Sequence, residues 1–294
     1  KGYDYVGDSV DDLPVWRSAK QAYVVGDSGS LVKRALAQGN VSEVFDAEKR
    51  PFLHSLTRAL RPHQWVKNLL VFVPLLGAHQ YGEWLSVLLV LLAFVAFSMT
   101  ASCVYLFNDL VDVAVDRQHK RKRHRPFAAG DLSLLCGWVI WPLLLFSAFS
   151  LATLSLPNQF VVVLSVYFLL TFAYSLFLKR VPILDVLTLA GLYTLRIIAG
   201  AAAIGVSLSF WLLSFSMFIF LSLAFIKRFA ELKSVCVDNQ AGKLHGRGYQ
   251  HEDLEVVSTM GTGAGYLSVL VLSLYIQDEA TAQMYQSPTY IWLA

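Results

Sequence analysis

The sequence has little charge, and long stretches of it have none. Of its 294 residues, 15% are charged and 56% are hydrophobic, whereas a soluble globular domain usually has about 25% charged residues. Trp84–Phe107 and Leu132–Leu178 contain no Asp, Glu, Lys or Arg at all. About 20 mostly apolar residues are enough to cross a bilayer. The composition therefore excludes an ordinary soluble domain and predicts a membrane protein with several spans.

Cysteine is equally scarce. The three cysteines, Cys103, Cys136 and Cys236, are widely spaced. They give neither a disulfide framework nor the close Cys pairs of a structural zinc site. We therefore expect any chemistry in this protein to come from other residue types.

The first part of the chain, residues 1–48, is polar and mixed in composition. Val-Gly-Asp-Ser occurs twice, starting at Val6 and at Val25, each time after a short β-rich run. The segment between the two copies has helical character, which predicts two strand–loop–helix units of an α/β fold. Two such units are too small to close a core of their own. We expect residues 1–48 to be the C-terminal fragment of a larger α/β domain, residues 49–60 to be a linker and residues 61–294 to be the membrane domain.

The membrane domain is expected to be all-helical. Eight spans are predicted from the apolar runs, the last of them cut short by the end of the chain. They lie at 65–82, 84–107, 133–156, 158–178, 185–205, 208–226 and 257–276, with the eighth opening near 288. Every Lys and Arg except Arg196 falls before or at the start of the first span, or in alternate connections at 117–125, 179–180 and 227–247. The excess of cations on one side predicts that these loops face the cytoplasm.

Between two uncharged runs stands NDLVDVAVDRQHKRKRHRPFAAG, at 108–130. At about 100° per residue, Asn108, Asp109, Asp112 and Asp116 share one helical face within an arc of about 100°. Carboxylates gathered in this way suit Mg²⁺, which commonly bridges protein carboxylates to substrate phosphates. The alternative is a solvated helix end whose acids form ion pairs along the helix.

The basic stretch that follows, which includes Arg125, allows two interpretations. Cytoplasmic loops carry Lys and Arg for topology alone. Cations beside a Mg²⁺ site would also attract and hold a polyphosphate.

NDLVDVAVDRQHKRKRHRPFAAG resembles the first Asp-rich motif of the UbiA superfamily of intramembrane prenyltransferases. RPHQWVKN (61–68), YSLFLKRVPILDV (174–186) and RIIAGAAA (196–203) are similar to further motifs of that family. The resemblance implies a helical bundle, normally of nine spans, around a cavity open to the cytoplasm of a bacterial plasma membrane. It also implies a diphosphate substrate held through Mg²⁺ by Asp109, Asp112 and Asp116, with Asn108 beside them, and a lipid chain lying within the membrane.

The connection at 226–257 departs from the pattern of aromatic prenyltransferases, because it lacks a second DxxxD motif. Its KRFAEL segment resembles the decaprenyl-phosphate phosphoribosyltransferases. That branch implies transfer of 5-phosphoribose from phosphoribosyl pyrophosphate to a polyprenyl phosphate. The loop side chains expected to contact substrate are Lys227, Arg228, Glu231 and Arg247. Two alternatives remain: an aromatic prenyltransferase that uses an isoprenyl diphosphate, and a transporter with a cytoplasmic acidic gate.

Other polar residues stand in apolar surroundings. Lys67 either extends to the lipid headgroups or contacts the diphosphate. Tyr174, Lys179 and Asp185 either anchor the membrane interface or bind substrate. Arg196 is a functional candidate by its depth in a span, and its alternative is a structural ion pair. Direct pairing with Asp185 is not expected, because eleven residues of helix separate the two by roughly 16 Å.

YVGDSVDDLP, near the start of the chain, resembles the final motif of haloacid-dehalogenase-type phosphatases. The resemblance implies a vestigial Mg²⁺ site at Asp8 and Asp12. The alternative is a cytoplasmic appendage without chemistry.

Overall fold

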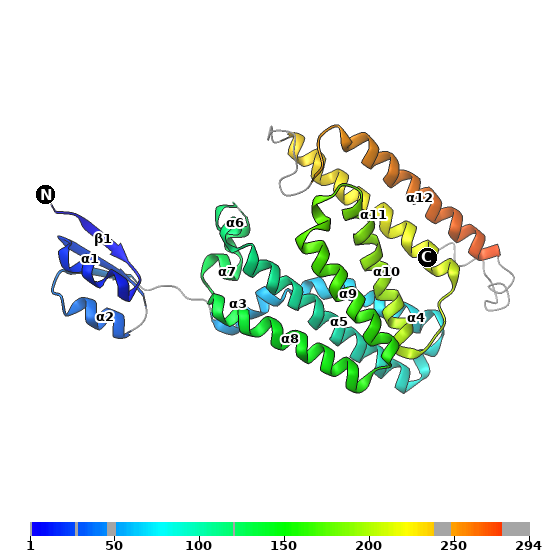
Figure 1. The fold of residues 1–294 in the computed structure, drawn as a ribbon, viewed down its shortest axis with the longest axis horizontal. Helices are drawn as coiled ribbons and strands as arrows, with labels where there is room; N and C mark the ends of the chain where they lie inside the picture. The colour runs from blue at the N-terminus through cyan, green and yellow to red at the C-terminus, as the bar shows by residue number, and fades with distance from the viewer. Residues whose placement is uncertain (1, 27–28, 46–50, 120, 238–247, 278–294) are drawn as a thin grey trace. The chain divides into compact units, whose positions relative to one another are not determined.

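The computed structural model describes residues 2–26, 29–45, 51–119, 121–237 and 248–277. The chain divides into two compact units, Lys1–His54 and Ser55–Ala294, and Figure 1 shows the elements of each. The division falls inside the segment predicted to be a linker.

The N-terminal unit contains a parallel sheet of three strands in the order β1-β2-β3. Two short helices connect them and cover a small core around Trp16 and Val24. The elements are β1 (Asp4–Gly7), α1 (Leu13–Ser18), β2 (Gln21–Val25), α2 (Gly29–Leu36) and β3 (Val41–Phe45). Each Val-Gly-Asp-Ser copy begins at the end of a strand and leads toward a helix, which is the arrangement that a βαβ unit requires.

The second unit is built on six helices that are long and apolar enough to cross a membrane. These are α5 (Trp84–Val111), α8 (Leu134–Ser155), α9 (Asn158–Leu176), α10 (Leu184–Ile204), α11 (Phe210–Val237) and α12 (Asp253–Gln277). In lipid the backbone must satisfy its own hydrogen bonds, so an uncharged run of this length forms a continuous helix. The predicted spans from 84 to 276 are thereby confirmed as helices, although α11 continues to Val237, well beyond the predicted end at 226.

The remaining helices are short. They are α3 (Phe52–Leu60), α4 (Val73–Gly77), α6 (Val113–Gln118) and α7 (Pro126–Ala129), with 3₁₀ segments at Pro62–Phe72, Gln80–Gly82, Lys122–His124 and Leu178–Arg180 and, in the N-terminal unit, at Val10–Asp12.

The first predicted span, at 65–82, is wrong as a continuous membrane helix. Residues 62–72 form a 3₁₀ segment, followed by the short α4. Pro74 lies in the first turn of α4, where a proline is tolerated, whereas farther inside a helix its missing amide hydrogen and its ring would disrupt the turn before it. The segment packs against α10 so closely that a Cβ on Gly200 would overlap the carbonyl of Val71. The span predicted near 288 lies outside the described residues.

The largest apolar core lies where α5, α9 and α10 meet the 62–72 segment, and it contains Phe97 and Tyr167. Helix α10 also packs against α11, and α11 lies alongside α12 (Figure 1). Gly261 allows the approach of α12, because a Cβ there would lie 2.9 Å from that of Phe225. The bundle therefore places the C-terminal ends of α5 and α9 and the N-terminal end of α10 in one region, where the acidic motif lies.

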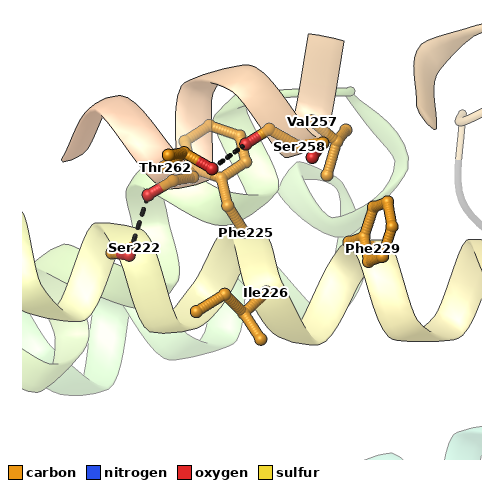
Figure 2. Close-up of a pocket in the computed structure, with 8 residues that line it drawn as sticks. Ser222, Phe225, Ile226, Phe229, Val257, Ser258 and Thr262 are labelled. Carbon is orange, nitrogen blue, oxygen red and sulfur yellow. Dashed lines mark hydrogen bonds between the residues drawn. The ribbon is translucent and has the colours of Figure 1, made fainter. Parts of the chain in front are cut away.

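Figure 2 shows a pocket between α11 and α12. The Ser222 hydroxyl donates to the carbonyl of Gly261 at 2.8 Å, and the Thr262 hydroxyl donates to that of Ser258 at 2.9 Å. The lining is otherwise apolar and contains no charged side chain. This pocket is therefore unsuited to a diphosphate.

Candidate active site

The acidic motif bends at Asp112. Helix α5 ends at Val111, Asp112 has φ −87° and ψ 3°, and α6 begins at Val113. The prediction that all four polar residues share one face of one helix is therefore wrong, because the motif spans a junction between two helices. Asp109 belongs to α5 and Asp116 to α6, and the Asp116 amide still donates to the Asp112 carbonyl at 2.8 Å.

Asp109 and Asp116 are almost fully buried, with 2% and 1% of their surfaces exposed. A single nitrogen, Nη1 of Arg125, lies 3.0 Å from Oδ1 of Asp109 and 2.6 Å from Oδ2 of Asp116. Burying two carboxylates is costly unless a cation pairs with them. Arg125 therefore holds the two acids together from the opposite end of the basic loop.

The residue after Arg125 explains its placement. Pro126 is the first residue of α7, and Arg125 precedes it with φ −67° and ψ 146°. A residue before proline is restricted to such extended conformations. The Arg-Pro pair thus ends the basic loop and fixes the backbone from which the guanidinium reaches the acids.

A second Arg-Pro pair supplies the other cation. Nη2 of Arg61 lies 2.6 Å and 2.9 Å from the two carboxylate oxygens of Asp109. Its guanidinium also covers the ring of Tyr105 at 5.2 Å. Arg61 has φ 53° and ψ 56°, a left-handed conformation that costs a residue with a side chain about 1–3 kcal/mol and tends to occur at functional sites. Arg61 was not among the predicted site residues, although it opens the motif RPHQWVKN and the Arg-Pro pair occurs again at Arg125.

The donor set fits Mg²⁺ in part. Oδ1 of Asp116 is buried and has no hydrogen-bond partner in the described part of the chain, and Lys122 approaches it only to 3.9 Å. Asp112 is half-buried, and no contact joins it to the arginines. Among the described residues, no three His, Cys, Asp or Glu side chains converge as a metal-binding group. Mg²⁺ can bind through one or two carboxylates plus substrate phosphates, so Asp109 and Asp116 would suffice with a phosphate present.

The remaining motif residue joins α5 to α9. The Asn108 side-chain amide donates to the Ser175 hydroxyl at 2.9 Å. Tyr174, next to Ser175, lies near the charges of Arg228 and Asp185. Asn108 therefore fixes the end of α5 against a second predicted site segment.

Three predicted substrate contacts pair with one another instead. Arg228 is fully buried, its Nη2 lies 2.5 Å from Oδ2 of Asp185, and its Nη1 contacts Glu231. Asp185 also accepts a hydrogen bond at 2.6 Å from the Tyr249 hydroxyl, whose residue is 1% exposed. The expectation that Arg228 contacts phosphate directly does not fit this arrangement, because its charge is already neutralised. Sequence reasoning missed Tyr249, which has no motif around it.

Arg196 is held by polar and aromatic neighbours. Its Nε donates to Asn68 at 2.9 Å and its Nη1 to the carbonyl of Leu192 at 2.5 Å. The guanidinium lies 5.2 Å from the ring centroid of Tyr167 and 5.1 Å from that of Tyr193. As expected, Asp185 is not its partner. These contacts satisfy the arginine without a carboxylate.

Cations also gather around Lys67. Burial, and then the nearby charges of Lys227, Arg196 and Arg61, lower the pKa of Lys67. Lys67 is half-buried and Lys227 is exposed, and neither forms an ion pair within the described residues. Such a group favours an anionic ligand. Lys179 is half-buried, and its side chain makes no ion pair within the described residues. Arg247 lies outside the described residues.

In the N-terminal unit, both carboxylate oxygens of Asp12 accept hydrogen bonds from nearby residues. One oxygen accepts from the amides of Asp8 and Ser9 at 3.0 and 2.9 Å, and the other accepts from the Tyr5 hydroxyl at 2.9 Å. Gly7 leaves room for this carboxylate, because a Cβ there would overlap it. Asp8 is exposed. The Asp12 carboxylate thus stabilises a turn in this structure, and the Mg²⁺ site at Asp8 and Asp12 stays a prediction.

Six helices are long and apolar enough to cross a membrane, and a buried carboxylate pair with basic side chains lies at one end of them, which is the architecture of an integral membrane protein. Residues 69–276 match the UbiA prenyltransferase family. The chain belongs to this family.

Three relatives with different names are similar to this chain. The protein y4nM of Sinorhizobium fredii is 36% identical over 100% of this chain and 57% of its own length. The nodulation protein NoeC of Azorhizobium caulinodans is 39% identical over 81% of this chain and 76% of its own. Decaprenyl-phosphate phosphoribosyltransferase of Mycobacterium tuberculosis is 38% identical over 60% of each chain. The chain therefore spans little more than half the length of two of these three relatives.

A solved structure agrees on the fold. The UbiA homologue of Archaeoglobus fulgidus bound to GPP and Mg²⁺ superposes with a TM-score of 0.64 and 17% identity, over 81% of this chain and 83% of that one. At this identity, the likeness supports the fold alone.

Proposed function

We propose that this transferase moves 5-phosphoribose from phosphoribosyl pyrophosphate to a polyprenyl phosphate, with Mg²⁺ and with loss of diphosphate. The observation that carries the proposal is the excess of cations around one buried carboxylate pair. Arg61 and Arg125 contact the pair directly, and Lys67 and Lys227 lie near one another with no carboxylate partner among the described residues. A donor with both a diphosphate and a 5-phosphate, reacting with a lipid phosphate, requires more positive charge than an isoprenyl diphosphate and a neutral ring.

The relatives support the same direction. The 38% identity to decaprenyl-phosphate phosphoribosyltransferase extends over 60% of the chain. The 226–257 connection has no second DxxxD motif, which favours the phosphoribosyltransferase branch over the aromatic one.

The chain's own residues suggest how the transfer proceeds. Asp109 and Asp116 would hold Mg²⁺, which when bound neutralises charge on the leaving diphosphate. Arg61 and Arg125, which lie beside these carboxylates, would contact the diphosphate oxygens. The bond between ribose C1 and the diphosphate oxygen breaks, the diphosphate leaves with the electron pair, and an oxygen of the lipid phosphate bonds to C1. Lys67 and Lys227 would hold that lipid phosphate. The site is proposed to face the cytoplasm of a bacterial plasma membrane, because the cations gather there.

An aromatic prenyltransferase is the second candidate. One observation favours it, namely that the Archaeoglobus homologue of this fold is bound to GPP. Its donor would use the same carboxylate pair, and its acceptor would carry a ring in place of the lipid phosphate.

One assay distinguishes the two. Purified protein in detergent would be given Mg²⁺ with labelled phosphoribosyl pyrophosphate and a polyprenyl phosphate, and in parallel an isoprenyl diphosphate with aromatic acids. We expect a labelled lipid product only in the first reaction, and none after chelation of Mg²⁺. A product in the second reaction alone would assign the protein to the aromatic branch.

A further inference from the structure

A second pocket, of about 300 Å³, lies beside the carboxylate pair. Four arginines and two histidines line it, together with Asp109, its one acidic side chain, and Pro126. The basic residues come from three segments: Arg58 from α3, Arg61 and His63 from the start of the 62–72 segment, and Arg121, His124 and Arg125 from the basic loop. We call this group the arginine pocket. Its volume is at the lower end of the range for small-molecule sites.

Several donors in the arginine pocket lack an adequate partner. The side chains of Arg121 and His63 make no ion pair or hydrogen bond within the described ranges. Nη1 of Arg58 is buried without a hydrogen bond, and its ion pair with Asp131 is long, at 3.6 Å. Nη2 of Arg58 donates to the carbonyl of His124 at 2.9 Å, which fixes the guanidinium at the wall. Arg121 and His63 are exposed to solvent, whereas Nη1 of Arg58 is a buried donor, and a buried donor without a hydrogen bond indicates a missing acceptor.

The arginine pocket and the acidic site share residues. Arg61, Asp109 and Arg125 line the pocket and also form the carboxylate bridge. A ligand in the pocket is therefore one side chain away from a diphosphate at Asp109 and Asp116. Only a ribose ring separates the two phosphorylated ends of phosphoribosyl pyrophosphate.

We propose that the arginine pocket binds a phosphomonoester, and that in the proposed reaction this group is the 5-phosphate of the donor. The assignment to the donor rests on the proposed function. Arginine is suited to the task, because its planar fork can bind phosphate oxygens in pairs. The lining also disfavours the lipid substrate as occupant, since Pro126 is its one apolar residue and an isoprenoid chain requires apolar surface.

The test compares two ligands in two variants. Binding of phosphoribosyl pyrophosphate and of inorganic diphosphate, each with Mg²⁺, would be measured by calorimetry on the full chain. In Arg58→Gln and Arg121→Gln we expect affinity for phosphoribosyl pyrophosphate to fall roughly 10- to 100-fold, the effect of losing a charge-assisted contact. Affinity for diphosphate should stay within about twofold. Arg121 is exposed and has no partner to lose, so its variant keeps the test valid if Arg58→Gln fails to fold.

Arg117→Gln is the matched control, because it removes the same charge from an exposed position of α6 outside the pocket. If affinity falls equally for both ligands, or falls equally in Arg117→Gln, the effect is one of general electrostatics. Either result would overturn the proposal that the arginine pocket binds a phosphomonoester. An unchanged preference for phosphoribosyl pyrophosphate in both pocket variants would do so as well. If the unmodified protein binds diphosphate but not phosphoribosyl pyrophosphate, the proposed function fails. In that case the arginine pocket is tested by the binding of ribose 5-phosphate, and affinity for it should fall in the same two variants.

A phospholipid headgroup could supply the same phosphate chemistry. The measurement would be repeated in nanodiscs of phosphatidylcholine with and without phosphatidylglycerol. If the anionic lipid weakens donor binding, and Arg121→Gln removes that competition, the pocket holds a headgroup and the assignment to the donor is overturned. We expect no such competition.

Discussion

The hydroxyl of Tyr249 donates a hydrogen bond to Asp185 at 2.6 Å across 64 residues of sequence. The same hydroxyl accepts the amide of Ile183 at 2.7 Å. Ile183 has φ 67° and ψ −49°, and the Leu184 amide donates to the Pro182 carbonyl at 2.7 Å. This is a γ-turn of the rare, strained hand. Tyr249 therefore stabilises a turn that a β-branched residue would otherwise avoid, directly before the helix that carries Asp185.

Tyr249→Phe should loosen this turn. The change leaves a buried amide and a buried carboxylate each short of one partner, which costs about 1–3 kcal/mol. Burial, and then the hydrogen bond to Asp185, raise the pKa of Tyr249, so the hydroxyl remains a donor at neutral pH. Hydrogen exchange at residues 181–185 should become faster and the melting temperature should fall. Tyr266→Phe is the control, because Tyr266 is 74% exposed on α12. Equal behaviour of the two variants would contradict the assigned role.

Asp116→Asn should abolish Mg²⁺-dependent turnover while the protein stays folded. Asp116 lies against Arg125, and the amide removes the charge that a metal and the arginine both need. We expect activity to fall by at least about 100-fold, the scale of losing one electrostatic contact in a transition state. The Mg²⁺ concentration for half-maximal activity should rise in Asp112→Asn if that carboxylate joins the metal when substrate binds. Glu255→Gln, at an exposed position of α12, is the control. Near-normal activity of Asp116→Asn would make the acidic pair structural.

The membrane helices could be predicted because lipid leaves an uncharged run few alternatives to a continuous helix. The same reasoning failed at 65–82, where Pro74 breaks the helix although the composition is apolar. It failed again at Asp112, since a helical wheel assumes a straight helix and the chain bends there.

The acidic motif could be predicted from residue types, but its partners could not. Arg61 and Asp109 are 48 residues apart, and their contact depends on how the 62–72 segment packs against α5. Arg228 illustrates the same limit. It stands in a charge-rich segment that suggests exposure, yet packing against α10 buries it beside Asp185. Tertiary packing decides which cations are paired with carboxylates, and the sequence alone does not show it.

Arg196 should prove structural. Arg196→Gln removes a guanidinium that satisfies Asn68 and fills the space between Tyr167 and Tyr193. Leaving buried polar groups without partners costs about 1–3 kcal/mol, so we expect a lower melting temperature with little change in KM for phosphoribosyl pyrophosphate. Lys227→Gln is the comparison, because Lys227 is exposed and near Lys67, and it should raise KM for the lipid acceptor without loss of stability. A large rise in donor KM in Arg196→Gln alone would return Arg196 to the substrate site.

Asp12 should make the N-terminal unit sensitive to acid. The amide of Ser9, together with the Tyr5 hydroxyl and the Asp8 amide, outweighs burial and lowers the pKa of Asp12. A carboxyl with a lowered folded pKa contributes stability above its unfolded value of about 3.9, and that contribution is lost as the pH falls through the folded value. Asp12 closes a capping box with Ser9, so Asp12→Ala should cost about 1 kcal/mol at neutral pH.

The measurement is hydrogen exchange within residues 4–25 of the full chain. At neutral pH, Asp12→Ala should lower protection about fivefold, the equivalent of 1 kcal/mol, whereas Asp11→Ala should not, because Asp11 is exposed and its side chain caps nothing. Acidification below about pH 3.9 should reduce the difference between Asp12→Ala and the unmodified chain, since protonation removes from the latter what the substitution has already removed. If that difference stays constant into acid, the contribution of Asp12 does not depend on its charge, and the turn is held by packing over Gly7.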